Sequence, residues 1–255
     1  MAPRTLLLGL SGPSSSGKTT LARLLRAALA PHAFIVHEDD FYHADSAIPL
    51  RTMSDGRRLP DWDCADAIDA AALRRMLAFA REHGRPQDGF DSIQGGNEVR
   101  EVQVGEEVVR RWTEEFGALL AEEEMRVCIV DGFLLFSEEM SGVRELFDVR
   151  MLLRADFATV KARREVRKGY VTLEAFWEDP EGYVDEVVWP NYVKDHAFLF
   201  KDGDVEGELD EHKVSELGID VAPKESVNDM TLCFEWASQI LRTAIAGRSN
   251  GSDKA

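Results

Sequence analysis

A glycine-rich segment near the start of the chain has the residue types and spacing of a phosphate-binding loop. Residues 12–19 read GPSSSGKT, which matches the pattern G-x-x-x-x-G-K-[ST] in full. Backbone N–H groups of such a loop surround a phosphate, and the N-terminus of the following helix adds a favourable dipole. We expect Lys18 to pair with the β- and γ-phosphates of ATP and the Thr19 hydroxyl to bind Mg²⁺. The predicted nucleotide-binding residues here are Gly12, Ser14, Ser15, Ser16, Gly17, Lys18, Thr19 and Thr20.

A second candidate metal ligand follows an apolar run in the middle of the chain. Asp131 comes directly after residues 127–130, which read VCIV. A carboxylate at the end of a buried strand can hold Mg²⁺ beside a bound triphosphate, here through a water molecule. Asp-Gly is also a common turn pair. The presence of the phosphate-binding pattern makes us favour the metal role.

A basic segment supplies cations that a phosphate site would need. Residues 156–168 read DFATVKARREVRK and contain Arg163, Arg164, Arg167 and Lys168. Such residues on a helix usually form a solvated face, but a phosphoryl-transfer enzyme needs guanidinium groups that reach the migrating phosphoryl and close the site. Arg163 and Arg167 are four residues apart and share one helix face. We therefore predict a lid in this region.

Apolar runs alternate with helical periodicity along most of the chain, which predicts an α/β fold with a parallel sheet covered by helices on both faces. The expected strands are 5–10, 33–36, 127–130 and 149–153. The expected helices are 17–30, 63–83, 106–124, 156–168 and 226–246.

The length of 255 residues is consistent with one domain, which we place at 1–247. Within it we expect a polar, glycine-rich surface insertion at 84–105, a lid region at 156–180 and an acidic loop at 202–225, followed by a disordered tail at 248–255. The three cysteines, Cys64, Cys128 and Cys233, are widely spaced and odd in number, so we interpret them as buried small side chains.

The charge distribution excludes some partners. The net charge is −17, and the stretches 82–124 and 201–225 carry −8 and −6 of it. A nucleic-acid-binding protein needs a basic surface that this chain lacks. No apolar run approaches the roughly 18 residues of a membrane span, and we expect a cytoplasmic protein without a membrane partner. A GTPase would carry an N-K-x-D segment, which is absent, so a compact small-molecule kinase remains.

The segment HEDDFY at 37–42, directly after the apolar run AFIV, resembles the D-x-F-Y-like motif of the uridine kinase and phosphoribulokinase superfamily of P-loop kinases. Four further features narrow the resemblance to the nicotinamide riboside kinase family, over most of residues 5–203. They are PDWD at 60–63, DGFLLF at 131–136, the arginine-rich segment ending at Tyr170, and VVWPNY at 187–192. The resemblance implies a P-loop NTPase three-layer sandwich with a small helical lid, a monomer or weak homodimer, and ATP and Mg²⁺ as ligands.

The resemblance also implies roles for individual residues. Asp39 is the expected general base toward the ribose 5′-hydroxyl and lies near the metal; Lys18, Arg163 and Arg167 complete the catalytic set on the ATP side. The implied residues on the substrate side are Asp39, Asp40, Tyr42, Trp62, Asp63, Arg164 and Tyr170, and the implied metal ligands are Thr19, Asp39 and Asp131.

Some alternatives stay open in the sequence. Asp63 could instead be the N-cap of the following helix, and either tyrosine could be a core residue. The segment between Arg167 and Tyr170 is one residue longer than the family pattern. The implied reaction is transfer of the ATP γ-phosphoryl to the 5′-hydroxyl of nicotinamide riboside, with nicotinic acid riboside as a second candidate acceptor. A uridine- or cytidine-type nucleoside kinase and a non-catalytic ATP-binding regulator are the alternatives.

Overall fold

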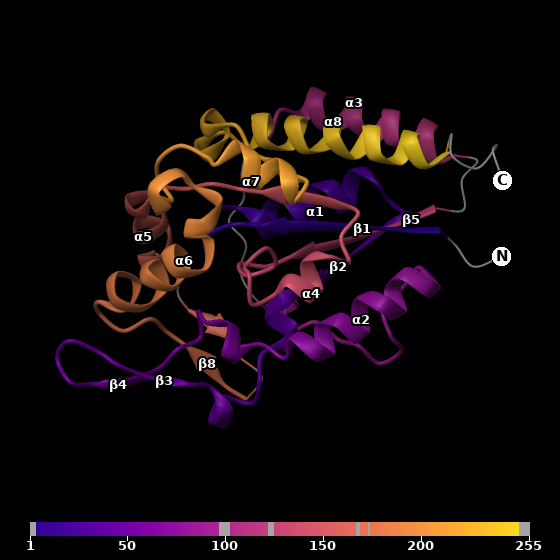
Figure 1. The fold of residues 1–255 in the computed structure, drawn as a ribbon. Helices are drawn as coiled ribbons and strands as arrows, with labels where there is room; N and C mark the ends of the chain where they lie inside the picture. The colour runs from indigo at the N-terminus through magenta and orange to yellow at the C-terminus, as the bar shows by residue number, and fades with distance from the viewer. Residues whose placement is uncertain (1–3, 97–102, 122–124, 167–168, 173, 250–255) are drawn as a thin grey trace.

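A five-stranded parallel sheet forms the centre of the molecule (Figure 1). The computed structural model describes residues 4–96, 103–121, 125–166, 169–172 and 174–249. The strands in spatial order are β2 (Ala33–His37), β5 (Met125–Asp131), β1 (Arg4–Ser11), β6 (Val149–Leu152) and β9 (Ile219–Val221). All four pairings are parallel, so the carboxyl ends of the strands lie at one edge of the sheet, where ligands of open α/β folds bind.

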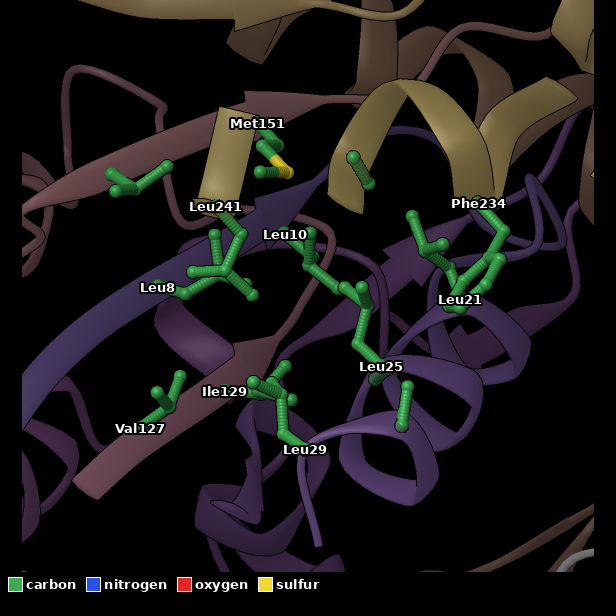
Figure 2. Close-up of a cluster of buried hydrophobic side chains, with 14 of the residues drawn as sticks. Leu8, Leu10, Leu21, Leu25, Leu29, Val127, Ile129, Met151, Phe234 and Leu241 are labelled. Atoms are coloured by element: carbon green, nitrogen blue, oxygen red, sulfur yellow. The ribbon is translucent and has the colours of Figure 1, made fainter. Parts of the chain in front are cut away.

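Helices cover both faces of this sheet, because successive side chains of a strand point to opposite sides. On β1, Leu8 and Leu10 belong to one buried cluster and Leu7 to another. The first face packs against α1 (Lys18–Ala28), α3 (Glu106–Leu120) and α8 (Met230–Ser249), and the second against α2 (Ala70–His83) and α4 (Ser141–Arg144). Figure 2 shows Phe234 and Leu241 of α8 lying over the first face with α1. The α/β sandwich expected from the sequence is confirmed.

Smaller elements surround the carboxyl edge of the sheet. They are the hairpin β3 (Leu50–Thr52) and β4 (Arg58–Pro60), helix α5 (Phe157–Glu165), the hairpin β7 (Tyr170–Val171) and β8 (Phe176–Trp177), helix α6 (Trp189–His196) and helix α7 (Glu211–Glu216). A π-helical turn, Val184–Val188, leads into α6. In Figure 1, α5, α6 and the two hairpins lie on the same side of the molecule.

Several predicted element boundaries were wrong. The helix expected at 63–83 begins at Ala70, because Asp69 is its N-cap and accepts a hydrogen bond from the Ala72 N–H at 2.8 Å. The last helix begins at Met230 instead of 226. The acidic stretch 202–225 is more than a loop, since it contains α7 and the edge strand β9, which pairs with β6.

The expected surface insertion at 84–105 also needs correction. Residues 97–102 lie outside the described residues, but a short 3₁₀ helix spans Ile93–Gly96. The Gln94 side chain is buried, and the Phe90 ring stacks on the Phe41 ring with centroids 5.9 Å apart. Phe90 and Gln94 therefore pack against the rest of the domain, while other residues of the segment, such as Gln87 and Asp91, are exposed as expected.

Among the helices in the described parts of the chain, none combines the length and the apolar composition that crossing a bilayer requires. The predicted tail at 248–255 is helical up to Ser249 and otherwise lies outside the described residues.

A buried histidine on α6 predicts how stability depends on pH. His196 is fully buried, and its Nδ1 lies 3.1 Å from the Tyr192 carbonyl oxygen, which can only accept, so Nδ1 carries the proton. Burial lowers the pKa of His196 to about 4, whereas an unfolded histidine titrates near 6.5. The unfolded chain therefore binds more protons in this range, and the stabilisation present above pH 6.5 is lost as the pH falls toward 4.

We expect His196→Leu to be less acid-sensitive than the wild type. Between pH 7 and pH 4.5, the free energy of unfolding of the variant should fall by on the order of 2 kcal/mol less, since each pH unit of differential titration is worth about 1.4 kcal/mol. Denaturant unfolding at the two pH values measures this. Parallel pH profiles for both proteins would contradict the assignment.

Candidate functional site

The loop between β1 and α1 has the conformation that its glycines permit. Gly12 has φ +142°, and a Cβ there would lie 2.4 Å from the Leu153 carbonyl oxygen. Gly17 has φ +102° and is the N-cap residue of α1. Side chains larger than hydrogen are unfavourable at both positions. Lys18 begins α1 and folds back along the loop, where its Nζ donates to the carbonyl oxygens of Gly12 and Pro13, each at 2.9 Å.

A cavity of about 350 Å³ opens beside this loop. Predicted residues of the loop and of helix α1 line it, namely Ser14, Ser15, Gly17, Lys18, Thr19 and Thr20. Two other predicted loop residues, Gly12 and Ser16, do not line it. The same cavity is lined by Asp39, Tyr42, Trp62, Asp63, Arg164 and Tyr170. A cavity of this size is in the usual range for small-molecule sites.

The carboxylate of Asp131, at the end of β5, lies against the start of α1. Its Oδ2 accepts a hydrogen bond from the Thr19 hydroxyl at 2.6 Å, and its Oδ1 is bonded to the ring Nδ1 of His37 at the end of β2. Burial alone would raise the pKa of Asp131, but the hydrogen bond and charge of His37 outweigh it and lower the pKa. The pKa of His37 is raised by the same contact despite its burial. Asp131 is therefore ionised at neutral pH.

The two neighbouring aspartates after β2 have different surroundings. Asp39 lines the cavity, and its Oδ2 accepts a hydrogen bond from the Gln94 Nε2 at 3.0 Å. Asp40 does not line the cavity; its Oδ1 accepts from the Ser92 hydroxyl at 2.9 Å and from the Ile93 N–H at 3.0 Å. Of the pair, only Asp39 faces a space that a substrate could occupy.

Glu38, the residue that follows β2, is a buried carboxyl group. Its Oε2 accepts from the backbone N–H groups of Phe133 at 2.6 Å and Leu134 at 3.1 Å. Burial raises its pKa to about 8, so the group is mainly neutral at pH 7. Glu38 thus fastens the end of β2 to the turn after β5 without adding a charge.

Two arginines of α5, Arg163 and Arg164, line the cavity. Arg163 donates to the Ser15 carbonyl oxygen at 3.2 Å and to the Val227 carbonyl oxygen at 2.7 Å, and so links the phosphate-binding loop to the segment before α8. Val227 and Asn228 of that segment and Met230, the first residue of α8, also line the cavity. Arg167 lies outside the described residues.

Arg164 is buried, and all five of its N–H groups have acceptors. It binds Asp63 through two hydrogen bonds of 2.8 and 3.0 Å, Asp179 through two of 2.5 and 3.2 Å, and the Ser14 hydroxyl through one of 2.9 Å. Asp63 therefore pairs with Arg164, and the alternative that it caps α2 is wrong, since Asp69 does so. Removing one partner of such a buried ion pair strongly destabilises the folded protein, because the other charge is left buried and unpaired.

Aromatic rings form the wall of the cavity next to this cluster. The Tyr42 and Trp62 rings meet edge to face with centroids 5.3 Å apart, and the Trp62 and Trp177 centroids are 6.1 Å apart. The Tyr170 ring lies over the Arg164 guanidinium, 4.9 Å from its Cζ. Tyr170 thus faces the cavity in spite of the extra residue that precedes it in the sequence.

Comparison with known proteins assigns the family. The chain is 35% identical over 246 residues to the nicotinamide riboside kinase of Schizosaccharomyces pombe, covering 96% of this chain and 100% of the relative. It is 38% identical to the nicotinamide riboside kinase of Eremothecium gossypii, covering 84% and 85%, and 36% identical to that of Saccharomyces cerevisiae, covering 89% and 89%.

The chain belongs to the nicotinamide riboside kinase family. No protein-family model matches it. A solved structure described as a possible uridine kinase from Bacillus stearothermophilus overlaps 66% of this chain and 85% of that chain, with 19% identity and a TM-score of 0.37, which is too low to bear on the assignment.

The cavity residues near the phosphate-binding loop fit the Mg²⁺ expected from the sequence. Within the described residues no group of three or more His, Cys, Asp or Glu side chains could hold a metal alone. Mg²⁺ is commonly bound by one or two carboxylates together with substrate phosphates and waters. The ionised Asp131 carboxylate beside the Thr19 hydroxyl, with Asp39 in the same cavity, is a hard-oxygen donor set of this kind.

Four contributors to the site were not found from the sequence. His37 is bonded to Asp131, Gln94 to Asp39, and Asp179 to Arg164, while Trp177 extends the aromatic wall. His37 is the first residue of the segment HEDDFY, so its position next to three carboxylates was a signal that it could pair with an acidic side chain. For Gln94, in a polar segment without periodicity, we find no sequence signal.

Proposed function

We propose that the protein transfers the γ-phosphoryl group of ATP to the 5′-hydroxyl of nicotinamide riboside, giving nicotinamide mononucleotide for NAD biosynthesis. Family membership supports the reaction class. Nicotinamide riboside carries a cationic pyridinium ring, and the aromatic wall of the cavity suits such a ring. The wall adjoins a buried cluster of two carboxylates and one guanidinium, Asp63, Asp179 and Arg164, with a formal charge of −1. Aromatic rings next to a net negative charge are the observation on which the choice of substrate rests.

The phosphate-binding loop and the lid would hold the nucleotide. Backbone N–H groups of the loop and the Lys18 ammonium bind the phosphates, and Arg163 approaches from α5. Thr19, Asp131 and Asp39 are the residues that would hold Mg²⁺, which when bound neutralises charge on the β- and γ-phosphates. Catalysis in this reaction class is mainly positioning and charge stabilisation.

Asp39 would act as the general base. It lines the cavity that residues of the phosphate-binding loop and of the aromatic wall also line, so it can accept the proton of the ribose 5′-hydroxyl. Asp63 would accept hydrogen bonds from the ribose 2′- and 3′-hydroxyls. Each of its oxygens takes one bond from Arg164 and has a lone pair left for another donor.

The proposed reaction is tested by measuring ADP release from the purified protein with ATP and Mg²⁺. The nucleoside panel contains nicotinamide riboside, nicotinic acid riboside, uridine and cytidine. We expect the highest kcat/KM with nicotinamide riboside and little ADP release without a nucleoside. Preference for uridine or cytidine would assign a pyrimidine nucleoside kinase, and ATP binding with no turnover would indicate a regulatory protein.

The aromatic wall predicts a charge-dependent effect of Tyr42→Leu. Leucine keeps an apolar side chain but removes the π-face, and a cation–π contact is worth about 1–2 kcal/mol when desolvated. The KM for nicotinamide riboside should rise by about 5- to 30-fold. The 1,4-dihydro form of the riboside has nearly the same shape and no positive charge, so its KM should change by less than about threefold. Equal losses for both ligands would contradict a cation–π role.

A further inference from the structure

The segment 90–94 is attached to both aspartates that follow β2. Ser92 and Ile93 bind Asp40, as described above, and Gln94 binds Asp39. The Arg23 guanidinium of α1 donates to the Gln94 carbonyl oxygen at 3.3 Å, and this hydrogen bond holds the backbone of Gln94 against α1. The segment thus connects the predicted base to the helix that begins with the phosphate-binding lysine.

The Gln94 side chain has a defined orientation. It is 6% exposed and lines the cavity, and its Nε2 lies 3.0 Å from Asp39 Oδ2. The opposite amide orientation would set a carbonyl oxygen against a carboxylate oxygen, which is repulsive, so the NH₂ group is the one that faces Asp39. Hydrogen bonds to an ionised acceptor are among the stronger ones in proteins.

We propose that Gln94 is a positioning residue for the phosphoryl transfer, an inference that rests on the proposed function. Its amide holds Oδ2 of Asp39 and so orients the carboxylate that accepts the proton of the 5′-hydroxyl. Asp39 lies in a single 3₁₀ turn, Glu38–Phe41, and Gln94 contacts it from a segment more than 50 residues away in sequence. A displacement of about 1 Å in such a group can lower a rate roughly 100-fold.

The inference is tested with Gln94→Met, which keeps the length and approximate volume of the side chain and removes the donor. We expect kcat with nicotinamide riboside to fall about 10- to 100-fold, the range that a hydrogen bond to a charged group supplies. The KM for ATP should stay within about threefold, because the Gln94 amide bonds to Asp39, whereas residues 12–20 form the loop that binds the phosphates. Gln94→Glu places a second carboxylate next to Asp39, so its loss of kcat should exceed that of Gln94→Met.

Gln87→Met is the matched control, since Gln87 is an exposed glutamine in the same stretch of chain. Its kcat should equal that of the wild type. Thermal unfolding midpoints of all variants separate a loss of positioning from a loss of folding. An Asp39→Ala background supplies the decisive comparison: a residue that acts through Asp39 has no further effect once Asp39 is gone.

A kcat for Gln94→Met within twofold of the wild type overturns the inference, as does an equally large loss in the Asp39→Ala background. A loss confined to the KM for the nucleoside would also overturn it, because this would make Gln94 a substrate contact. A wild-type protein that does not phosphorylate nicotinamide riboside is a different result, which overturns the proposed function and this inference with it.

Discussion

Replacing Asp39 with asparagine is expected to lower kcat by about 10²- to 10⁴-fold, the contribution of a positioned general base. Asparagine keeps the size of the side chain and still accepts a hydrogen bond from Gln94, but it cannot take the proton of the acceptor hydroxyl. Binding of ATP should persist, because the phosphate-binding loop is built from residues 12–20 and its backbone. Steady-state kinetics and calorimetric titration of ATP measure the two properties separately.

Asp91→Asn is the control for this variant, since Asp91 is exposed in the segment that packs on the site. It makes the same chemical change and should leave kcat unaltered. Near-wild-type turnover by Asp39→Asn would remove Asp39 as the base.

Lys18→Ala is the second substitution with a large expected effect. We expect kcat/KM for ATP to fall by about 10³-fold, comparable to the loss of a preorganised charged donor in other transfer reactions. The Lys18 ammonium is pinned by two carbonyl oxygens of the loop, each at 2.9 Å, and this space suits a compact ammonium better than a planar guanidinium. Lys18→Arg should therefore recover little of the lost activity.

Lys194→Ala controls for the loss of a positive charge elsewhere. Lys194 is exposed and pairs with Glu139 at 3.0 Å on the surface, where such pairs contribute little. Its kinetic constants should match the wild type. A Lys18→Ala protein with normal kcat/KM would show that the loop does not bind the phosphates as proposed.

The local patterns of the sequence predicted four of the five strands of the sheet and the position of the glycine-rich loop before α1. The run before Gly12 and the residues of α1 change from continuous apolar to helical periodicity within about eight positions, and this signal needs no tertiary information. The elements that the sequence did not predict depend on contacts between residues far apart in the chain. Strand β9 has three residues in an acidic stretch, and pairing with β6 outweighs its weak propensity.

Local sequence patterns also failed to predict the packing of segment 84–96 at the site. Its polar, glycine-containing sequence predicts a loop on any local criterion. Its position depends on hydrogen bonds to Asp39 and Asp40, more than 50 residues away in sequence, and on the stacking of Phe90 on Phe41. Likewise, Arg164 on a basic helix predicts a solvated face, and only the fold brings Asp63 and Asp179 to it.

The most direct test of the central claim is the stoichiometry of products from ATP and nicotinamide riboside. Chromatography with mass spectrometry measures ADP and nicotinamide mononucleotide in the same samples over time. We predict one mononucleotide for each ADP formed, with the phosphate on the 5′-oxygen. ADP formed without the mononucleotide, or a phosphorylated product from uridine but none from nicotinamide riboside, would contradict the account.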